Sequence, residues 1–321
     1  MFMRTTLAML CLALSSVPLI SASGSHQNMR VYEQIIGRWD MTIHEANGGQ
    51  YPSWFEASRE PGKLTGRFVG RVGSQRPIKS IEFADGHLTF SLPIQYERHK
   101  TDLKFEANLV GGRLEGTTFD PNGVTLKWTA VRAPTLERKS SRIGKPITLF
   151  NGRDLSGWKV RDAKKADAWR VVDGVMENTP HGTDIITEQK FTDFILHIEF
   201  KMVEKSNSGV YLRGRYEVQI EDNFGMEPES HRIGGIYGFI SPRSNPSKKA
   251  GEWQSFDITL IGRKVRVDLN DKPIMGIIEI PGITGGALDS NEGEPGPIML
   301  QGDHEKIYYR NIVIKPIPAR D

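Results

Sequence analysis

The sequence has almost no cysteine. Its single thiol, Cys11, lies inside an apolar run near the start of the chain. A mature chain without that run would hold no thiol and no disulfide, which excludes cysteine nucleophiles and zinc sites built from thiolates. Runs of basic residues are also missing: 42 Lys and Arg nearly balance 39 Asp and Glu. This balance argues against a nucleic-acid partner.

The opening stretch "MFMRTTLAMLCLALSSVPLISASGS" has the layout of a secretory signal peptide. It combines an early positive charge at Arg4, an apolar run and small residues at 21–23, and it is too short and wrongly flanked for a membrane span. We therefore expect an exported protein, periplasmic or secreted, that begins near residue 23 and carries no lipid. A lipoprotein is the weaker alternative, because Cys11 is not preceded by small residues.

Glycine is abundant, with 33 residues and frequent Asp-Gly or Asn-Gly pairs, which favours an all-β protein with tight turns. The length suits two domains. The stretch "RAPTLERKSSRIGKP" is charged, holds two prolines and lacks periodicity, as linkers do. We therefore predict a signal peptide over 1–23, an N-terminal β domain of unknown role over 24–135, a linker over 136–146 and a second domain over 147–318.

The first domain shows two hairpin patterns, "KSIEFADGHLTFSL" and "LKFEANLVGGRLEGTTF". Its opening segment "VYEQIIGRWDMTI" resembles the start of lipocalin-like barrels, in which a tryptophan closes one end. This resemblance predicts a small β-barrel-like domain of the lipocalin-like kind. Trp39 as an ordinary core residue is the alternative.

The second domain is again β-rich. In "TDFILHIEFKM", apolar residues alternate with polar ones, and "AWRVVDGVMENT" and "FDITLIGRKVRVDLNDKPI" are hairpin patterns. No segment has a long helical period. Strands at this spacing indicate a sandwich or jelly roll.

The segment "SNSGVYLRGRYEVQIED", residues 206–222, contains the most informative polar pattern. Apolar Tyr216, Val218 and Ile220 alternate with Glu217, Gln219 and Glu221. Since successive strand residues point to opposite faces, one face enters a core and the other presents acid, amide and acid. The row could be the solvated face of an outer strand. The hydrogen-bonding residues Asn207, Ser208 and Arg213 beside it favour a binding site instead.

Strings from residues 147 to 317 resemble, in order, the 3-keto-disaccharide hydrolase domain family. They include "ITLFNGRDLSGWKV", "SNSGVYLRGRYEVQIEDN", "GGIYGFISP" and "GPIMLQGDHEKIYYRNIVIKPI". The resemblance implies a concanavalin A-like lectin/glucanase jelly roll that cleaves glycosides whose glucose ring carries a ketone at C3. One departure is visible: the family usually has a Gln-x-His-Gly-type turn, and this chain has Gln301-Gly302-Asp303-His304-Glu305. Because the motifs lie within 147–317, we expect these residues alone to hold the activity.

Ordinary two-carboxylate glycoside cleavage fits the row poorly. A retaining enzyme needs two carboxyl groups about 5–5.5 Å apart. The neighbour of Glu217 on its face is the amide Gln219, and Glu221 lies about 13 Å further along the strand at about 3.3 Å per residue.

Cleavage of a substrate with a ketone at C3 would need different catalytic groups, because the ketone makes the hydrogen on C2 acidic. One base can then remove that hydrogen, and the C1 substituent leaves by elimination. We predict Glu217 as the base and His304 or Tyr237 as the acid. Arg213 or a bound cation would stabilise the enediolate. Asn207, Ser208, Gln219, Glu221 and Gln301 complete the predicted substrate-binding set.

A divalent cation is an open alternative, with Asp222 and His231 as its candidate ligands; no His-x-x-x-His or comparable spacing supports it. No other cofactor is indicated. The expected partner is a small carbohydrate, supplied by a separate dehydrogenase that oxidises C3. The rival function is a non-catalytic, lectin-like carbohydrate-binding protein, since fold alone does not decide function. A third reading is an adhesion module without sugar affinity.

Overall fold

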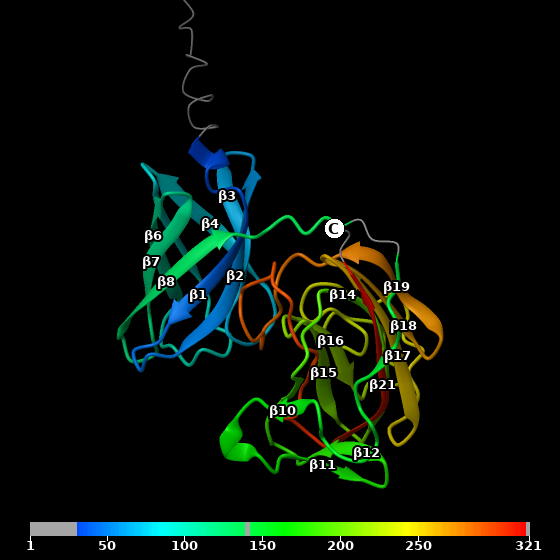
Figure 1. Cartoon of the computed structure of the whole chain (residues 1–321). Coiled ribbons are helices and arrows are strands. Elements are labelled where there is room, and N and C mark those ends of the chain that lie inside the picture. Colours follow the sequence, from blue (N-terminus) through cyan, green and yellow to red (C-terminus); the bar gives the residue numbers. More distant parts are fainter. Residues whose placement is uncertain (1–30, 139–141, 319–321) are drawn as a thin grey trace, which may run out of the picture.

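The computed structural model describes residues 31–138 and 142–318. The predicted signal peptide over residues 1–23 lies outside this part of the chain. The described residues form a closed β-barrel followed by two further β-sheets (Figure 1). The prediction of an all-β protein with a barrel-like domain before a jelly-roll sandwich is therefore confirmed. In the described residues, no helix has the length and apolar character needed to cross a membrane.

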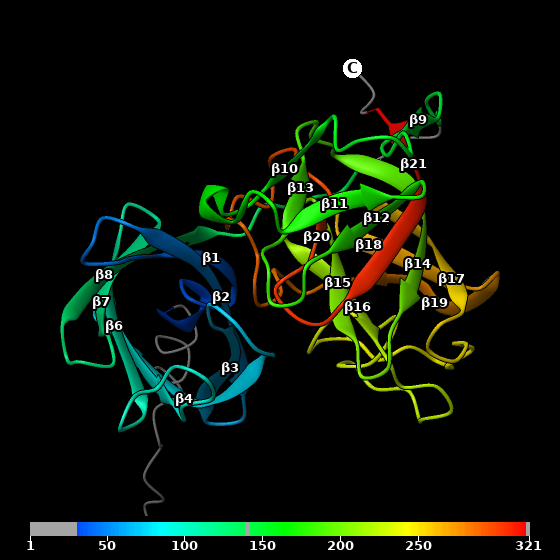
Figure 2. The same ribbon diagram turned by 90° about the horizontal axis from the view of Figure 1, so that it is seen from below.

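The barrel is an up-and-down meander, seen nearly end-on in Figure 2. Each strand pairs antiparallel with the next, and β1 also pairs with β8, which closes the sheet. Asp85, Gly86, Gly111 and Gly112 all have positive φ at the two predicted hairpins, as such tight turns require. The strands are β1 (Gly37–His44), β2 (Gln50–Glu60), β3 (Lys63–Val69), β4 (Arg76–Ala84), β5 (His87–Leu92), β6 (Leu103–Val110), β7 (Arg113–Phe119) and β8 (Thr125–Arg132).

Trp39 belongs to the barrel core. Its indole nitrogen donates to the Ile35 carbonyl over 2.8 Å, and its ring stacks on Phe55 with 6.1 Å between ring centroids. The guanidinium of Arg132 covers the ring from β8, 4.1 Å from the centroid. The ring thus connects the segment before β1 to strands β1, β2 and β8. It is buried, and its indole N–H has a hydrogen-bond partner.

The C-terminal part is a sandwich of two sheets. The five-stranded sheet has the order β10-β13-β20-β15-β16, and the eight-stranded sheet has the order β11-β12-β21-β14-β17-β18-β19 with β9 paired to β21. The elements are β9 (Ile147–Thr148), β10 (Trp158–Val160), the short 3-10 helix η1 (Ala163–Lys165), β11 (Trp169–Val172), β12 (Val175–Asn178), β13 (Ile185–Thr187), β14 (Asp193–Met202), β15 (Asn207–Leu212), β16 (Tyr216–Glu221), β17 (Trp253–Ile261), β18 (Lys264–Leu269), β19 (Lys272–Glu279), β20 (Met299–Leu300) and β21 (Ile307–Ile317).

The sandwich core forms where the apolar faces of the two sheets meet. In β14 every second residue is buried, as the alternation predicts, and these side chains pack in one cluster with Tyr216, Val218 and Ile220 of β16. Burial of a large apolar side chain contributes about 1.5–3 kcal/mol. This pairing of faces leaves the other face of β16 pointing out of the sandwich, toward the barrel side.

The barrel and the sandwich are in direct contact through the segment between β19 and β20, drawn in orange in Figure 1. The Gly286 amide donates to the carbonyl of Arg71 over 2.9 Å. A Cβ on Gly285 would lie 2.3 Å from the Gly73 carbonyl oxygen, so only glycine allows the two backbones to approach this closely. Trp54 of β2 is fully buried within the sandwich's apolar cluster.

A buried group of charged residues also crosses this contact. Asp40 of β1 is hydrogen-bonded to Glu292, which forms an ion pair with Arg263 and accepts from the Tyr216 hydroxyl, each over 2.7 Å. Burial and the nearby Glu292 charge raise the pKa of Asp40 above its ordinary value. The pKa of Glu292 is lowered despite its burial, because Arg263 bonds to it. Asp40 therefore holds the proton and Glu292 the charge.

Candidate functional site

The hairpin of β15 and β16 forms the floor of the site. Its strands turn through residues 213–215, where Arg213 and Gly214 have positive φ. This register sets Tyr211 directly opposite Glu217, and Gly209 opposite Gln219. The side chains of Tyr211, Glu217 and Gln219 point to the face away from the sandwich core, as the period of two along a strand requires, and Gly209 lies on the same face.

Above this floor lies a cleft of about 970 Å³ between the sandwich and the barrel. Its floor includes Asn207, Tyr211, Glu217 and Gln219, and it is bounded by loops of the sandwich and by barrel residues. Of the eleven residues that the sequence analysis put forward, the cleft brings together six, namely Glu217, Gln219, Asn207, Gln301, Tyr237 and His304.

Glu217 lies at the base of the cleft with only 3% of its surface exposed. The Tyr211 hydroxyl donates to its Oε2 over 2.8 Å and also lies 2.9 Å from the Gly285 carbonyl. Burial raises the pKa of Glu217 to about 8; the Tyr211 hydrogen bond opposes this, and the negative charges of Asp184 and Asp303 add to it. The carboxyl group is thus a stronger base than an exposed glutamate and exchanges its proton near neutral pH.

The backbone leaves room for Glu217. A Cβ on Gly209 would lie 2.3 Å from Glu217 Oε1 and 2.8 Å from its Cγ. A Cβ on Gly286 would in the same way lie 2.4 Å from the Tyr211 hydroxyl. Two glycines, one on the floor and one in the segment against the barrel, therefore allow the pair of Glu217 and Tyr211 to pack as it does.

Amide groups flank the carboxyl group. In the orientation that pairs its nitrogen with acceptors, Gln219 donates to Glu217 Oε1 over 3.1 Å and to the Ser208 carbonyl over 3.0 Å. Each oxygen of Glu217 then has one donor. Gln301, whose backbone amide donates to the Gly209 carbonyl, has a buried side-chain oxygen with no hydrogen-bond partner among the described residues. A buried oxygen without a partner is costly, and a ligand hydroxyl could satisfy it.

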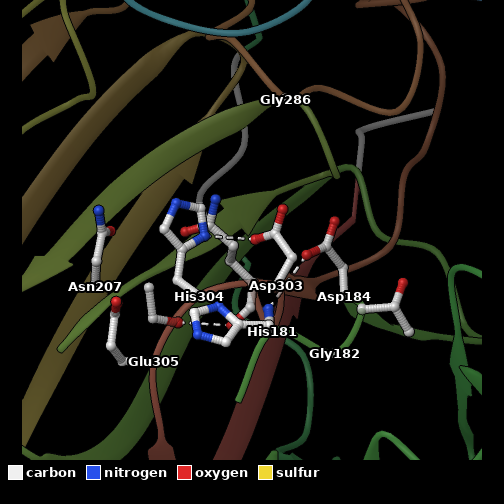
Figure 3. Close-up of polar contacts among 12 residues, drawn as sticks. His181, Gly182, Asp184, Asn207, Gly286, Asp303, His304 and Glu305 are labelled. Carbon is white, nitrogen blue, oxygen red and sulfur yellow. Dashed lines mark hydrogen bonds and ion pairs between the residues drawn. The ribbon is translucent and has the colours of Figure 1, made fainter. Parts of the chain in front are cut away.

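His304 and two aspartates form the acidic side of the cleft (Figure 3). His304 Nδ1 lies 2.6 Å from Asp303 Oδ1, and this contact raises the pKa of His304 while it lowers that of Asp303. Asp184 stands next to Asp303 and accepts from the backbone amide of Gly302 over 3.2 Å. Burial, with the charge of Asp303, raises the pKa of Asp184, although Arg161 pairs with it over 3.0 Å.

Tyr237 faces the cleft from the loop after β16. Its backbone amide donates to the Glu217 carbonyl over 3.1 Å, which places the ring beside the floor. Burial raises its pKa to about 12, and the charge of Glu217 adds to this. The phenol therefore keeps its proton at neutral pH and can donate it in a hydrogen bond.

Two predicted binding residues face the interior instead, and the structure corrects both assignments. Arg213 has no exposed surface; its guanidinium donates to the Tyr216 hydroxyl and to the Gly262 carbonyl. Ser208 has the opposite strand parity to Glu217, so its hydroxyl enters the core and contacts Tyr309 over 2.8 Å. Neither side chain lines the cleft.

Three further candidates lie outside the lining of the cleft. Glu221 is at the end of β16. Asp222 accepts from the Lys205 amide over 2.8 Å, which closes a local turn, and His231 packs edge-on against Tyr237 with 5.1 Å between centroids. Over 31–138 and 142–318, no group of three or more His, Cys, Asp or Glu side chains is arranged to hold a metal ion. Asp222 and His231 therefore have structural partners and do not form a ligand set.

Residues 145–315 match the family model described as the 3-keto-alpha-glucoside-1,2-lyase-like domain. The chain belongs to this family. Comparison with curated proteins gave no match.

Among solved structures, candidate glycosyl hydrolases from Parabacteroides distasonis are similar to this chain. One is 28% identical and covers 58% of this chain and 95% of its own, with a TM-score of 0.46. Another is 25% identical and covers 54% of this chain and 100% of its own, with a TM-score of 0.45. A carbohydrate-binding module from Bacillus subtilis is 10% identical and covers 49% of this chain and 93% of its own, with a TM-score of 0.36.

The match to the 3-keto-glucoside lyase-like family contains the whole floor of the cleft but not the barrel. Sequence reasoning missed Tyr211, Asp184, Asp303 and Arg161. Tyr211 could have been found, because a hairpin that turns at Gly214 pairs it with Glu217. Asp184 and Asp303 come from loops whose approach no strand period predicts.

Proposed function

We propose that this carbohydrate-active protein cleaves 3-keto-glucosides by removing the C2 proton and eliminating the C1 substituent. The observation that carries the proposal is Glu217, a carboxyl group buried at the base of a polar cleft with its pKa raised to about 8. Membership of the 3-keto-glucoside lyase-like family supports the substrate class. A C2 hydrogen beside a ketone is a weak acid, so a base with a raised pKa suits it.

In the proposed reaction, Glu217 takes the C2 proton and the C2–H electron pair forms an enolate with the C3 carbonyl. The enolate then re-forms the ketone, its electrons make the C1–C2 double bond, and the C1–O bond breaks. The departing oxygen takes a proton from His304. Addition of water to the double bond would complete a net hydrolysis; without it the reaction is a lyase reaction.

The side chains around Glu217 supply the remaining roles. The ion pair with Asp303 favours protonated His304, which makes it a proton donor near neutral pH. Because Arg213 is buried, we assign stabilisation of the enolate oxygen to hydrogen-bond donors of the cleft, with the Tyr237 phenol first among them. Gln219, Asn207 and Gln301 would hold sugar hydroxyls.

Ordinary two-carboxylate displacement remains the less favoured chemistry. The acids that influence Glu217 are Asp184 and Asp303. Asp303 is paired with His304 and Asp184 with Arg161. A carboxylate held by a cation is a poorer nucleophile, so this arrangement favours one base with one histidine acid.

The test is to incubate the protein with a 3-keto-glucoside and with its unoxidised parent, and to follow release of the leaving group. We expect turnover of the 3-keto compound alone, with exchange of its C2 hydrogen in deuterated water. Equal cleavage of both compounds would contradict elimination. Binding of both without cleavage would support a lectin-like protein instead.

The proposed chemistry also sets a place in a reaction sequence and a location. A reaction that oxidises the C3 hydroxyl must supply the substrate, so we propose a separate dehydrogenase upstream. We propose export on the basis of residues 1–23 of the sequence. Mass spectrometry of the protein made in cells should show loss of these residues and no acyl mass; their retention would contradict export by this route.

A further inference from the structure

The barrel contributes to the cleft that holds Glu217. Its contribution comes from the start of β2 and from the loops that follow β3 and β5, through Gln50, Tyr51, Pro52, Arg71, Val72, Gly73 and Tyr96. All of these lie outside the residues that match the family. The expectation that residues 147–317 alone hold the activity stays a prediction, made from a sequence in which nothing about the barrel indicated a site.

The barrel is held at a fixed position beside the floor. The Gly286 amide donates to the carbonyl of Arg71, and the neighbouring Gly285 carbonyl lies 2.9 Å from the Tyr211 hydroxyl that donates to Glu217. One short loop therefore contacts the barrel on one side and the partner of Glu217 on the other. Gly285 packs directly on the backbone at Gly73. This contact pre-forms the barrel side of the cleft before any ligand binds.

Tyr51 and Arg71 make a stacked pair at this side. The Arg71 guanidinium lies 5.2 Å from the centroid of the Tyr51 ring, and Glu45 accepts from it over 2.8 Å. The side chain of Arg71 is 59% exposed, so it still has N–H groups free to meet a ligand. A sugar ring has an apolar face and hydroxyl groups at its rim. It therefore binds well to flat aromatic rings that lie beside hydrogen-bond donors.

Tyr96 completes this side from the loop between β5 and β6. It is 60% exposed, the most exposed of the large aromatic residues in the described chain, and its ring lies over Gly73. A Cβ on Gly238, the residue after Tyr237, would lie 2.5 Å from Cβ of Ser74, the residue after Gly73. Tyr96 of the barrel and Tyr237 of the sandwich therefore line the same part of the cleft.

We infer that Tyr51, Arg71 and Tyr96, which we call the barrel wall, bind the leaving group of the substrate. The inference rests on the proposed function. The ring that loses its C2 proton must sit over Glu217, on the sandwich side. A cleft of about 970 Å³ is near the upper end of the usual range for small-molecule sites and leaves space for a second ring against the barrel. The barrel is thus a specificity domain for a leaving group that is itself a sugar.

The experiment compares two 3-keto-glucosides, one with a second sugar as leaving group and one with a methyl group. In the full chain, Tyr96→Ala and Arg71→Gln should each lower kcat/KM for the sugar leaving group about fivefold to tenfold, since a lost stacking contact has that effect. Turnover of the methyl compound should stay within about twofold. Arg71→Gln keeps the backbone carbonyl that receives the Gly286 amide.

Phe119→Ala is the matched control, because Phe119 is an exposed aromatic residue of the barrel that does not line this cleft. This variant should change kcat/KM for neither substrate. Equal losses on both substrates, or no loss on the sugar leaving group, would overturn the inference.

A binding measurement separates this inference from the proposed function. Calorimetric titration with the unoxidised disaccharide and with methyl glucoside needs no turnover. Weaker binding of the disaccharide alone in Tyr96→Ala would support the barrel wall even if no 3-keto-glucoside were cleaved. Unchanged disaccharide binding in that variant, or no disaccharide binding to the wild type, would overturn it.

Discussion

Strand β6 of the barrel and strand β16 of the sandwich have nearly the same alternating pattern but present their polar faces to different surroundings. In β6, Lys104, Glu106 and Asn108 are exposed to solvent. In β16, Glu217 and Gln219 are buried, because loops of the sandwich and the barrel cover that face. The same strand pattern is therefore ordinary surface when the face is open, whereas enclosure of the face raises the pKa of a carboxyl group such as Glu217.

The largest expected effect comes from removing the basic oxygen of Glu217. Glu217→Gln keeps the size of the side chain, so the fold and much of the sugar binding should remain. Turnover should fall by about 10²–10⁴, the usual contribution of general acid–base catalysis. Exchange of the C2 hydrogen with deuterated solvent should vanish with it. A variant with close to wild-type turnover would place the base elsewhere.

The pH dependence of kcat/KM gives a second test of Glu217 as the base. Glu217 must be deprotonated to act as a base, and its pKa is raised to about 8, so wild-type kcat/KM should rise with pH up to about 8. The equivalent change at Glu106 of β6, Glu106→Gln, is the control on an open strand face and should leave activity and its pH profile unchanged.

The next largest effect is expected from a variant that fills the space beside the Glu217 carboxyl group. Gly209→Ala would place a Cβ 2.3 Å from Glu217 Oε1, which must push the carboxyl group away from Tyr211. We expect a fall in kcat of at least about tenfold, because small misplacements of a catalytic group cost up to about 10²-fold. The strand pairing should survive, so far-ultraviolet circular dichroism should match the wild type. Wild-type kcat would show that the carboxyl position is unimportant.

Gly285→Ala tests the contact that covers the site. Its Cβ would lie 2.3 Å from the backbone oxygen of Gly73, so the barrel and the sandwich must separate locally. Overpacking of this kind typically destabilises by about 1–3 kcal/mol, which thermal denaturation would detect. Gly276→Ala is the control, since its nearest non-neighbouring atoms would be 3.6 Å away or more. Equal melting temperatures for both variants would show that the contact is loose.

The smallest expected effect concerns the buried acids at the same contact. The native state holds a proton on Asp40 that the unfolded chain releases above its ordinary pKa of 3.8, so this group makes the protein less stable as pH rises from about 4 through neutral. Asp40→Asn keeps a donor toward Glu292 without needing a proton. Its free energy of unfolding relative to wild type should therefore increase by about 1 kcal/mol between pH 5 and pH 6. Urea denaturation at both pH values measures this, and parallel pH curves for the two proteins would contradict it.

Local pattern by itself determined which residues are strands and which side of each strand is apolar. The period of two along β14 and β16 required one buried face each, and the Asp-Gly and Gly-Gly pairs required tight turns, since both depend on backbone geometry within a few residues. The family strings also pointed to the hairpin that carries Glu217. Of the six predicted site residues that line the cleft, Asn207, Glu217 and Gln219 belong to this hairpin.

Only the tertiary structure decided which polar residues meet. Strand parity sends Ser208 into the core although it neighbours the site in sequence, and Arg213 at the turn finds its partners inside the sandwich. Asp184 and Asp303 approach Glu217 from loops, and Tyr96 approaches from another domain. These encounters depend on how sheets and loops pack over long sequence distances, and that packing also sets the burial that shifts the pKa of Glu217.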